Sequence, residues 1–263
     1  EHDGATLYHG NDNAINEDTQ KKIASKFNID IAFLPYSGFG GFPAIYRFPV
    51  EVRDSLAEKK KNDIFEDFIQ AVKNLKTKYA VPAAGDLVLV GEDIGWMNYY
   101  DRCSPDEVYE WSKDHGIQEN ILVMKGGDSF DTDHGFIPHP DRDQWSYSLK
   151  DQNRFFSTPE VKSEVEKYFS WLHDVHSPSF QEEVLEYFRE GLSRYNEIAE
   201  MVDSKYLFSV RGTGKMACEV TIDFSDHSVR EGFDENYIKM VELPGTVLYR
   251  IMRGDFLWSD AYS

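Results

Sequence analysis

Asp12 lies in a turn of small and polar residues that follows a strand-like segment. Ala5–Tyr8 has the composition of a strand, and His9–Asn13 reads His-Gly-Asn-Asp-Asn. A carboxylate at the end of a strand is well placed to bind a divalent metal, because such cations prefer carboxylate oxygen and such sites gather at strand ends. The same pattern is typical of an Asx-turn, in which Asp12 accepts only backbone hydrogen bonds. Taken alone, the turn interpretation is favoured.

Three other groups of residues have types that could do chemistry. The glycine-rich loop Ser37–Pro43 could hold an anion on its backbone N–H groups, but it matches no phosphate-binding pattern, so a structural turn is favoured. Asp131–His134 and His139 offer oxygen and imidazole ligands without a defined metal spacing, which favours a solvated acidic loop. His173 and His176 are expected only to complement a helix dipole. The chain has no G-x-S-x-G motif, which weakens an α/β-hydrolase interpretation.

The elements that would position these residues alternate between strands and helices in the first half of the chain, which is the α/β pattern. Asp30–Pro35 is a short apolar strand, as in a sheet buried on both faces. Glu17–Phe27 is a predicted helix with Asn16 as its N-cap. A long helix follows, and its apolar stripe is strongest over Asp63–Lys76. Further predicted elements are the strands Tyr79–Val81, Leu87–Val90 and Ile121–Met124 and the helix Pro105–His115, capped by Ser104.

The second half begins after an irregular polar stretch, Ser129–Pro159, of a kind that is usually functional or a linker. We therefore place a domain boundary near residue 155 and expect units 1–155 and 156–263. The second unit is predicted to be a small α+β unit, in which Gly212–Gly214 forms a hairpin turn between two strands. Its predicted elements are the helices Glu160–Asp174 and Phe180–Met201, the strands Tyr206–Val210, Met216–Phe224 and Tyr237–Val241, and the helix Pro244–Arg253.

Composition excludes several classes of protein. The chain has 263 residues and a net charge of 28 − 47 = −19, with 41% hydrophobic residues, so it can bury a core but is a poor partner for nucleic acid or an anionic membrane. Its two cysteines, Cys103 and Cys218, form neither a disulfide framework nor a zinc motif. No apolar run approaches roughly 18 residues and no signal peptide is recognisable, so we expect a cytoplasmic protein. Because the chain begins without Met, we expect it to be part of a longer protein.

Three segments, in order, resemble the second half of a metallo-β-lactamase-fold protein, with lactonase-type hydrolases and CMP-N-acetylneuraminate hydroxylase as the nearest branch. Leu7–Asn13 is similar to the strand and turn that carry the metal-bridging Asp, usually S-G-D-T. Ala32–Gly38 is similar to the LLPYSG segment of that branch. The stretch from Phe65 through Tyr79–Gly85 resembles the helix and strand that lead to the last histidine ligand. Gly126–Asp128 and Gly254–Trp258 also resemble this branch.

The resemblance implies a fold, a site and a cofactor. The fold would be α/β, the second half of a metallo-β-lactamase-like αββα sandwich followed by the small α+β unit. Asp12 would be the bridging metal ligand, and Tyr36, Ser37 and Gly38 would contact the substrate. The family's H-x-H-x-D-H motif is absent, and Ala83 or Ala84 stands where its last histidine would be. Asp86 could then serve as an oxygen ligand, with zinc as the expected metal and iron or manganese as alternatives; Asp128 is a weaker candidate.

Three functions remain open at this level. The first is a portion of a metal-dependent hydrolase, in which metal-activated water attacks an ester, lactone or phosphoester of a small, anionic substrate. The second is a component of an iron oxygenase related to the hydroxylase, which would require an upstream C-x-H…C-x-x-H iron–sulfur motif. The third is a non-catalytic ligand-binding relative that has lost part of the metal site. The aromatic tail Tyr249–Trp258 could join two copies of the chain, although core packing is favoured.

Overall fold

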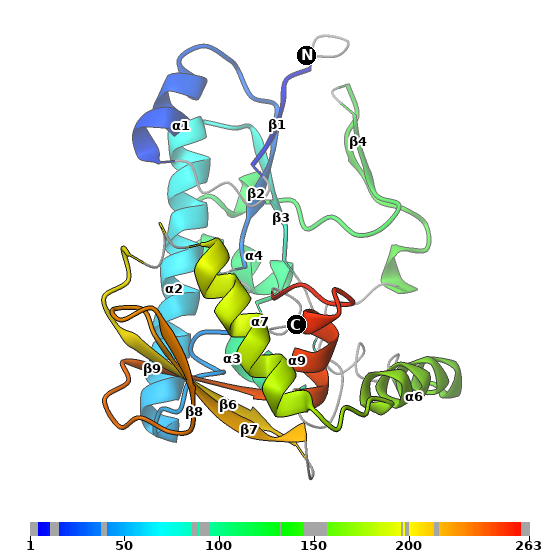
Figure 1. Ribbon diagram of the computed structural model, residues 1–263. Helices are drawn as coiled ribbons and strands as arrows, with labels where there is room; N and C mark the ends of the chain where they lie inside the picture. Colours follow the sequence, from blue (N-terminus) through cyan, green and yellow to red (C-terminus); the bar gives the residue numbers. More distant parts are fainter. Residues whose placement is uncertain are drawn as a thin grey trace. The chain divides into compact units, whose positions relative to one another are not determined.

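The protein divides into two compact units, Glu1–Thr158 and Pro159–Ser263. In the computed structural model (Figure 1) the described residues are 5–10, 16–37, 41–85, 89, 95–101, 103–131, 133–144, 157–195, 197, 200–212 and 216–258. The sequence placed the boundary near residue 155. Among the described residues, no helix has both the length and the apolar character needed to cross a membrane. The fold class is mixed α/β, with several small sheets.

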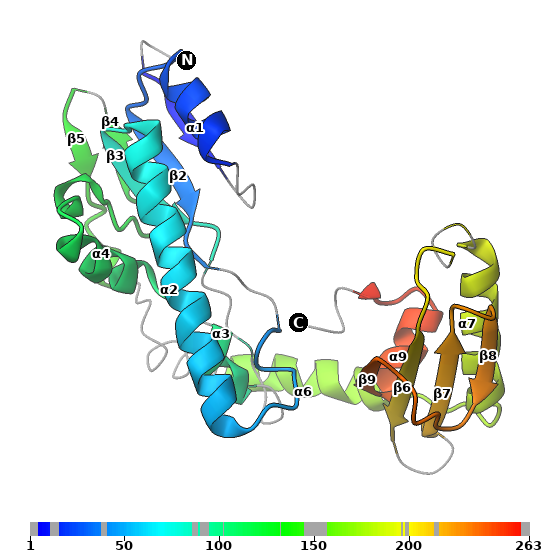
Figure 2. The same ribbon diagram turned by 90° about the vertical axis from the view of Figure 1, so that its left-hand side faces the viewer.

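The first unit is built on a three-stranded parallel sheet in the order β1-β2-β3. The strands are β1 (Leu7–His9), β2 (Ile31–Pro35) and β3 (Tyr79–Ala83), and helices α1 (Glu17–Ala24) and α2 (Val50–Leu75) connect them. Parallel neighbours need a crossover connection, and a helix is the usual one. Figure 2 shows α2 running along the three strands.

One face of this sheet packs against the helices. The register aligns Tyr8 with Ala32 and Ala32 with Ala80, so these three side chains share a face. They pack in one core with Phe65 and Phe68 of α2, both of which are almost fully buried. The apolar stripe that the sequence predicted on the long helix is therefore core packing, as expected.

The predicted helix Pro105–His115 is α4 (Pro105–Asp114), and Ser104 forms the predicted cap as part of a capping box with Glu107. The predicted strand Ile121–Met124 is wrong, because only Ile121 forms a parallel bridge, with Ala80. The polar stretch after it is more regular than the sequence predicted. The remaining elements of the unit are the 3₁₀ turns η1 (Gly95–Met97), η2 (Gln118–Asn120) and η3 (Arg142–Gln144), the short helix α3 (Asn98–Asp101), and the antiparallel strands β4 (Ser129–Asp131) and β5 (Gly135–Ile137).

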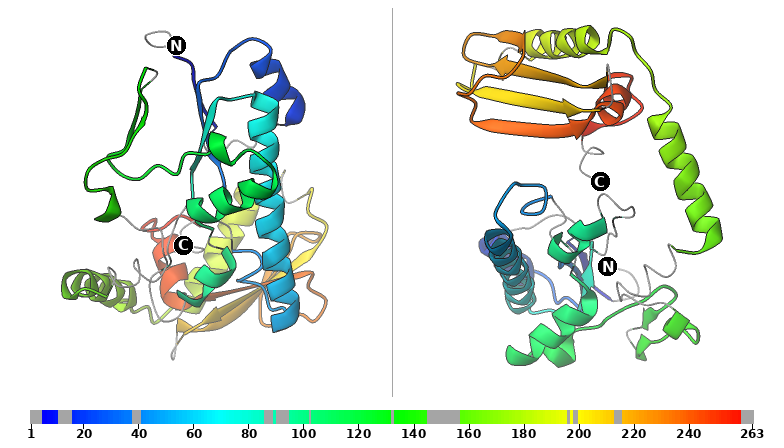
Figure 3. Two further views of the ribbon diagram at one scale, coloured as in Figure 1. Left: turned by 180° about the vertical axis from the view of Figure 1, so that it is seen from behind. Right: turned by 90° about the horizontal axis from the view of Figure 1, so that it is seen from below.

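The second unit has a four-stranded sheet in the order β8-β7-β6-β9, in which only the pair β6 and β9 is parallel. Figure 3 (right) shows α7 lying over this sheet, and α7 and α9 both contribute to the core on that face. The elements are α6 (Pro159–His173), α7 (Phe180–Arg194), β6 (Lys205–Arg211), β7 (Cys218–Asp223), β8 (Ser228–Glu231), β9 (Lys239–Pro244) and α9 (Gly245–Met252).

Sequence reasoning recovered the type of most elements of this unit but not all of their limits. It missed β8, whose four residues are too few for a clear alternation. It carried the second helix on to Met201, whereas α7 ends at Arg194, with Tyr195 as its C-cap. Of the predicted hairpin turn Gly212–Gly214, only Gly212 is among the described residues.

Candidate functional site

The three segments singled out in the sequence contain the strands β1, β2 and β3 and run toward one edge of the parallel sheet. Because β1, β2 and β3 run in the same direction, their C-terminal ends meet at that edge, where α/β proteins place their ligand sites. Ser37 follows β2 there by two residues, and Gly85 follows β3 by two residues. Asp12, Asp86 and Gly38, which sequence reasoning placed at the site, lie outside the described residues.

Two glycines allow the backbone of these segments to come close together. The Gly10 N–H donates to the Phe33 carbonyl at 2.8 Å, which joins the end of β1 to β2. A Cβ added at Gly85 would lie 2.6 Å from the Tyr36 ring and 2.7 Å from the Ser37 Cβ, so no larger residue fits without a shift. The ends of β1, β2 and β3 therefore form one contiguous edge.

Tyr36 and Ser37, both predicted to contact substrate, have different surroundings. The Tyr36 side chain is only 2% exposed and packs in the core of the first unit. Ser37 is half-buried. Of the two, Ser37 is therefore the one that a ligand at the edge could reach without moving the core.

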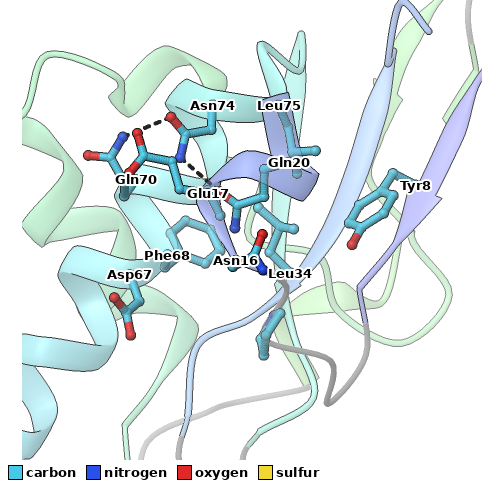
Figure 4. A pocket seen from close by; sticks show the side chains of 12 residues that line it. Tyr8, Asn16, Glu17, Gln20, Leu34, Asp67, Phe68, Gln70, Asn74 and Leu75 are labelled. Carbon is cyan, nitrogen blue, oxygen red and sulfur yellow. Dashed lines mark hydrogen bonds between the residues drawn. The ribbon is translucent and has the colours of Figure 1, made fainter. Parts of the chain in front are cut away.

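A cavity of about 350 Å³ lies on the helix-covered face of the sheet (Figure 4). The end of β2, the start of α1 and the C-terminal third of α2 all contribute to its wall. Its lining residues are Tyr8, Asn16, Glu17, Gln20, Leu34, Pro35, Asp67, Phe68, Gln70, Ala71, Asn74 and Leu75.

A chain of side-chain amides crosses one wall of this cavity. Gln70 Nε2 donates to Asn74 Oδ1 at 3.0 Å, and Asn74 Nδ2 donates to Gln20 Oε1 at 2.8 Å. Asn74 is only 7% exposed, so these bonds satisfy an amide that would be costly to bury alone. The chain ties α1 to α2. Beside it, Asn16 caps α1 by accepting a hydrogen bond from the Thr19 N–H at 2.9 Å.

The polarity of the cavity favours a neutral or cationic guest. Among the described residues that line it, Glu17 and Asp67 are charged and there is no Lys or Arg. Burial raises the pKa of Tyr8, so its phenol stays protonated at neutral pH and can donate a hydrogen bond. An anion would meet two carboxylates here. If the substrate is anionic, as the resemblance implies, it is expected at the strand ends and not in this cavity.

The other candidate carboxylates of the sequence serve local structure. The Asp128 carboxylate accepts hydrogen bonds from the Lys125 and His139 N–H groups, each at 2.8 Å, and pairs with Arg142. Burial alone would raise its pKa, but these donors outweigh burial and lower it. Asp131 closes a turn by accepting the His134 N–H at 2.8 Å. Within the described ranges, no three His, Cys, Asp or Glu side chains gather as a metal would require.

Sequence reasoning missed the amide chain of the cavity. A signal was present, because Gln70 and Asn74 are spaced four residues apart, which places both on one side of α2. Gln20, however, is 54 residues from Asn74, and its approach depends on how α1 packs against α2. The periodicity of either helix does not predict the angle at which the two helices pack.

Comparisons with protein-family models, with curated proteins and with solved structures give no match to this chain. No family membership is therefore assigned. What this protein does has to be inferred from its own residues, and above all from those at the sheet edge.

Proposed function

We propose that the first unit is a portion of a metal-dependent hydrolase of the metallo-β-lactamase superfamily, with Asp12 as a metal ligand. One observation carries this proposal. The three segments that resemble that superfamily follow three adjacent parallel strands, and they touch one another at Gly10 and Gly85. Catalytic residues of α/β proteins are found at this edge.

The two faces of the sheet also support the proposal. In an αββα sandwich, each sheet has helices on its outer face and a second sheet against its inner face. Here the helices cover the face of Ala32, whereas Leu7 on the opposite face is 57% exposed. On that same face the rings of His9 and Phe33 stack with their centroids 5.7 Å apart. Ile31 and Val81 on this face are already buried, and the Tyr79 ring contacts the Phe130 ring of β4 with centroids 5.2 Å apart. The part of the face at β1 is therefore the part that a second sheet could still cover.

The donors that this chain offers do not fit a complete metal site. Asp12 and Asp86 are the two candidate oxygen ligands, and Ala83 and Ala84 stand where a histidine would be expected. A zinc site takes about three or four protein ligands, so these residues could supply at most part of one. We therefore derive no catalytic step through a metal. A metal bound there would lower the pKa of its water and so supply hydroxide at neutral pH.

Metal content tests the role of Asp12. The natural protein that contains this chain should be purified as wild type and as Asp12→Ala, with zinc, iron and manganese measured by mass spectrometry together with hydrolysis of lactones and phosphoesters. Asp18→Ala is the matched control, because Asp18 is an acidic residue in the first turn of α1. We expect Asp12→Ala to lose bound metal and activity, and Asp18→Ala to keep both. Unchanged metal and activity in Asp12→Ala would show that Asp12 is not a ligand.

A non-catalytic ligand-binding function is the second candidate. It is favoured by Ala83 and Ala84 at the histidine position and by the 350 Å³ cavity with its amide chain. In this case the metal-free protein would bind a small polar molecule, and Asn74→Ala would weaken that binding. Equilibrium binding of neutral polar ligands to the chelator-treated protein distinguishes the two functions, since the hydrolase proposal predicts that chelation removes activity.

A further inference from the structure

The second unit contains a larger cavity, of about 570 Å³, between the C-terminal half of α7 and the sheet. Of its described lining residues, Trp258 alone lies in a segment that the sequence analysis compared with the metallo-β-lactamase fold. A volume of this size is in the usual range for sites that bind small molecules. Its lining residues are Tyr187, Phe188, Glu190, Gly191, Leu192, Arg194, Tyr195, Tyr206, Phe208, Ile222, Phe224, Lys239, Val241 and Trp258.

The wall of this cavity is apolar and aromatic. The rings of Phe188 and Phe208 have centroids 4.6 Å apart, and Trp258 contacts both of them. The Trp258 indole N–H donates to the Tyr187 hydroxyl at 2.9 Å, so its polar atom is already satisfied. Ile222, on the sheet side, is only 5% exposed. A guest would therefore meet hydrocarbon and ring faces along most of its length.

Gly191 lines this cavity at a position where a side chain would have room. It lies inside α7, where glycine is a poor helix former, and no atom would come within 4 Å of a Cβ placed on it. No close packing therefore explains the absence of a side chain at this position. A large side chain at Gly191 would extend into the cavity that it lines.

The mouth of the cavity carries cations. Arg194, the last residue of α7, and Lys239, at the start of β9, are both exposed lining residues. Neither forms an ion pair with any residue in the described part of the chain. Of the lining residues that the structure describes, Glu190 alone is acidic. In a chain with a net charge of −19, two unpaired cations beside one apolar cavity are a local positive site for an anionic group.

We propose that this cavity binds an amphiphile with a hydrocarbon tail and a carboxylate head, of the class of medium- and long-chain fatty acids. The tail lies among Phe188, Phe208 and Trp258, where burial of apolar surface drives binding. The head lies at the mouth, where Arg194 and Lys239 attract it. This binding is independent of the metal site proposed for the first unit.

Decanoate is the probe for the tail site, because it stays monomeric at the concentrations needed. Isothermal titration of the 263-residue chain should give a dissociation constant in the micromolar range. Gly191→Leu fills the cavity and should weaken binding at least tenfold without lowering the melting temperature. Ser193→Leu is the matched control, since it adds the same side chain at an exposed position of the same helix. An absence of decanoate binding up to 1 mM, or unchanged affinity in Gly191→Leu, overturns the proposal.

The head group is tested by comparing decanoate with 1-decanol. The double variant Arg194→Gln/Lys239→Gln should weaken decanoate binding about tenfold and leave 1-decanol binding unchanged. Arg189→Gln is the control, because Arg189 is on the same helix but pairs with Glu186. Equal losses for both probes, or no loss for either, would contradict an anionic head at the mouth.

Discussion

The cavities of the two units are lined by different kinds of side chain. In the first unit the cavity is crossed by amides, bordered by Glu17 and Asp67, and lies beside the ends of parallel strands. In the second unit the cavity is lined mainly by rings and aliphatic side chains, with Arg194 and Lys239 at its mouth. One chain thus offers a cavity with amides and carboxylates in its wall and a more aromatic cavity with cations at its mouth.

The difference follows from the sheets on which the cavities are built. In the first unit α1 and α2 both connect parallel strands and pack side by side, which brings the amides of Gln20, Gln70 and Asn74 together. The largely antiparallel sheet of the second unit instead presents an apolar face to α7 and α9, and the cavity beside it is lined by Gly191 of α7. The first arrangement suits polar recognition or chemistry, and the second suits storage of a hydrocarbon chain.

The largest effect is expected from truncating a core residue of one unit and asking whether the other unit responds. Phe180 is fully buried in the second core, so Phe180→Ala should destabilise that unit by about 3–5 kcal/mol. The two cysteines report on the units separately, because Cys103 is buried in the first core and Cys218 is half-buried in the second unit. Pulsed alkylation in urea should therefore label Cys218 of the variant at lower urea than Cys103.

The reciprocal change makes this test strict. Phe68→Ala removes a ring of the first core and should expose Cys103 before Cys218. Labelling must be done at neutral pH. Burial raises the pKa of the Cys218 thiol in the folded protein to about 11, so at neutral pH this thiol stays protonated and unreactive. Simultaneous labelling of both thiols in both variants would mean that the two units unfold as one.

Glycine substitutions contrast the two cavities more finely. Gly85→Ala would press a methyl group against the buried Tyr36 ring and should cost about 1–3 kcal/mol. Gly191→Ala meets open space inside a helix and should stabilise the protein by roughly 0.5–1 kcal/mol. Urea unfolding of both variants measures the expected loss of stability in Gly85→Ala and the expected gain in Gly191→Ala. An unchanged free energy of unfolding in Gly85→Ala would contradict close packing at the sheet edge.

Much of the fold follows from patterns that a sequence shows directly. The apolar stripe around Phe65 and Phe68 predicted the long helix, and Ser104 predicted the start of α4. Errors occurred where elements are short. β4 and β5 have three residues each, so they show no alternation, and Ile121 forms a single bridge where a strand was predicted.

The candidate sites divide in the same way. The sheet edge was predictable, because strands joined by helices run parallel and their ends must meet. The amide chain and the cavity at Gly191 were not, because each depends on how a helix packs against a partner far away in the chain. Gly191 in a helix interior was the one visible signal, but a single glycine in a helical pattern does not by itself predict a cavity, since close packing or a nearby helix end produces the same pattern.

Asp223 tests how a buried carboxylate is stabilised in the second unit. In the second unit its side chain is only 4% exposed and pairs with Lys205 and Arg230, each at 3.2 Å. Burial alone would raise its pKa, but the hydrogen bonds from Ser225 and Lys205 outweigh burial and lower it. Asp223→Asn should therefore cost about 1–3 kcal/mol at pH 7.

The sign of the pH dependence follows from that lowered pKa. The folded state favours ionised Asp223, so its contribution is present above the ordinary aspartate pKa of 3.8 and is lost as the pH falls through the lower folded value. The stability gap between wild type and Asp223→Asn should thus shrink below about pH 4. Asp226→Asn, at an exposed position, is the control. A gap that persists unchanged at pH 2 would show that lost packing, and not charge, causes it.

A small effect is expected at the start of α1, and it separates a wall of the first cavity from an ordinary helix end. Asn16 both caps α1 and lines the cavity, whereas Ser104 caps α4 away from it. Asn16→Ala and Ser104→Ala should each cost about 1 kcal/mol, because each leaves a first-turn N–H without its acceptor. Hydrogen exchange should quicken at Thr19 in the first variant and at Glu107 in the second.

Only the Asn16 change should reach the cavity. Fraying of the first turn of α1 loosens the support of Gln20, so the side-chain amide of Asn74 should exchange faster in Asn16→Ala than in Ser104→Ala. Amide NMR of Asn74 measures this directly. If both variants leave Asn74 unchanged, then loosening of the first turn of α1 does not reach the bond between Gln20 and Asn74, and the rest of α1 is enough to hold this wall of the cavity.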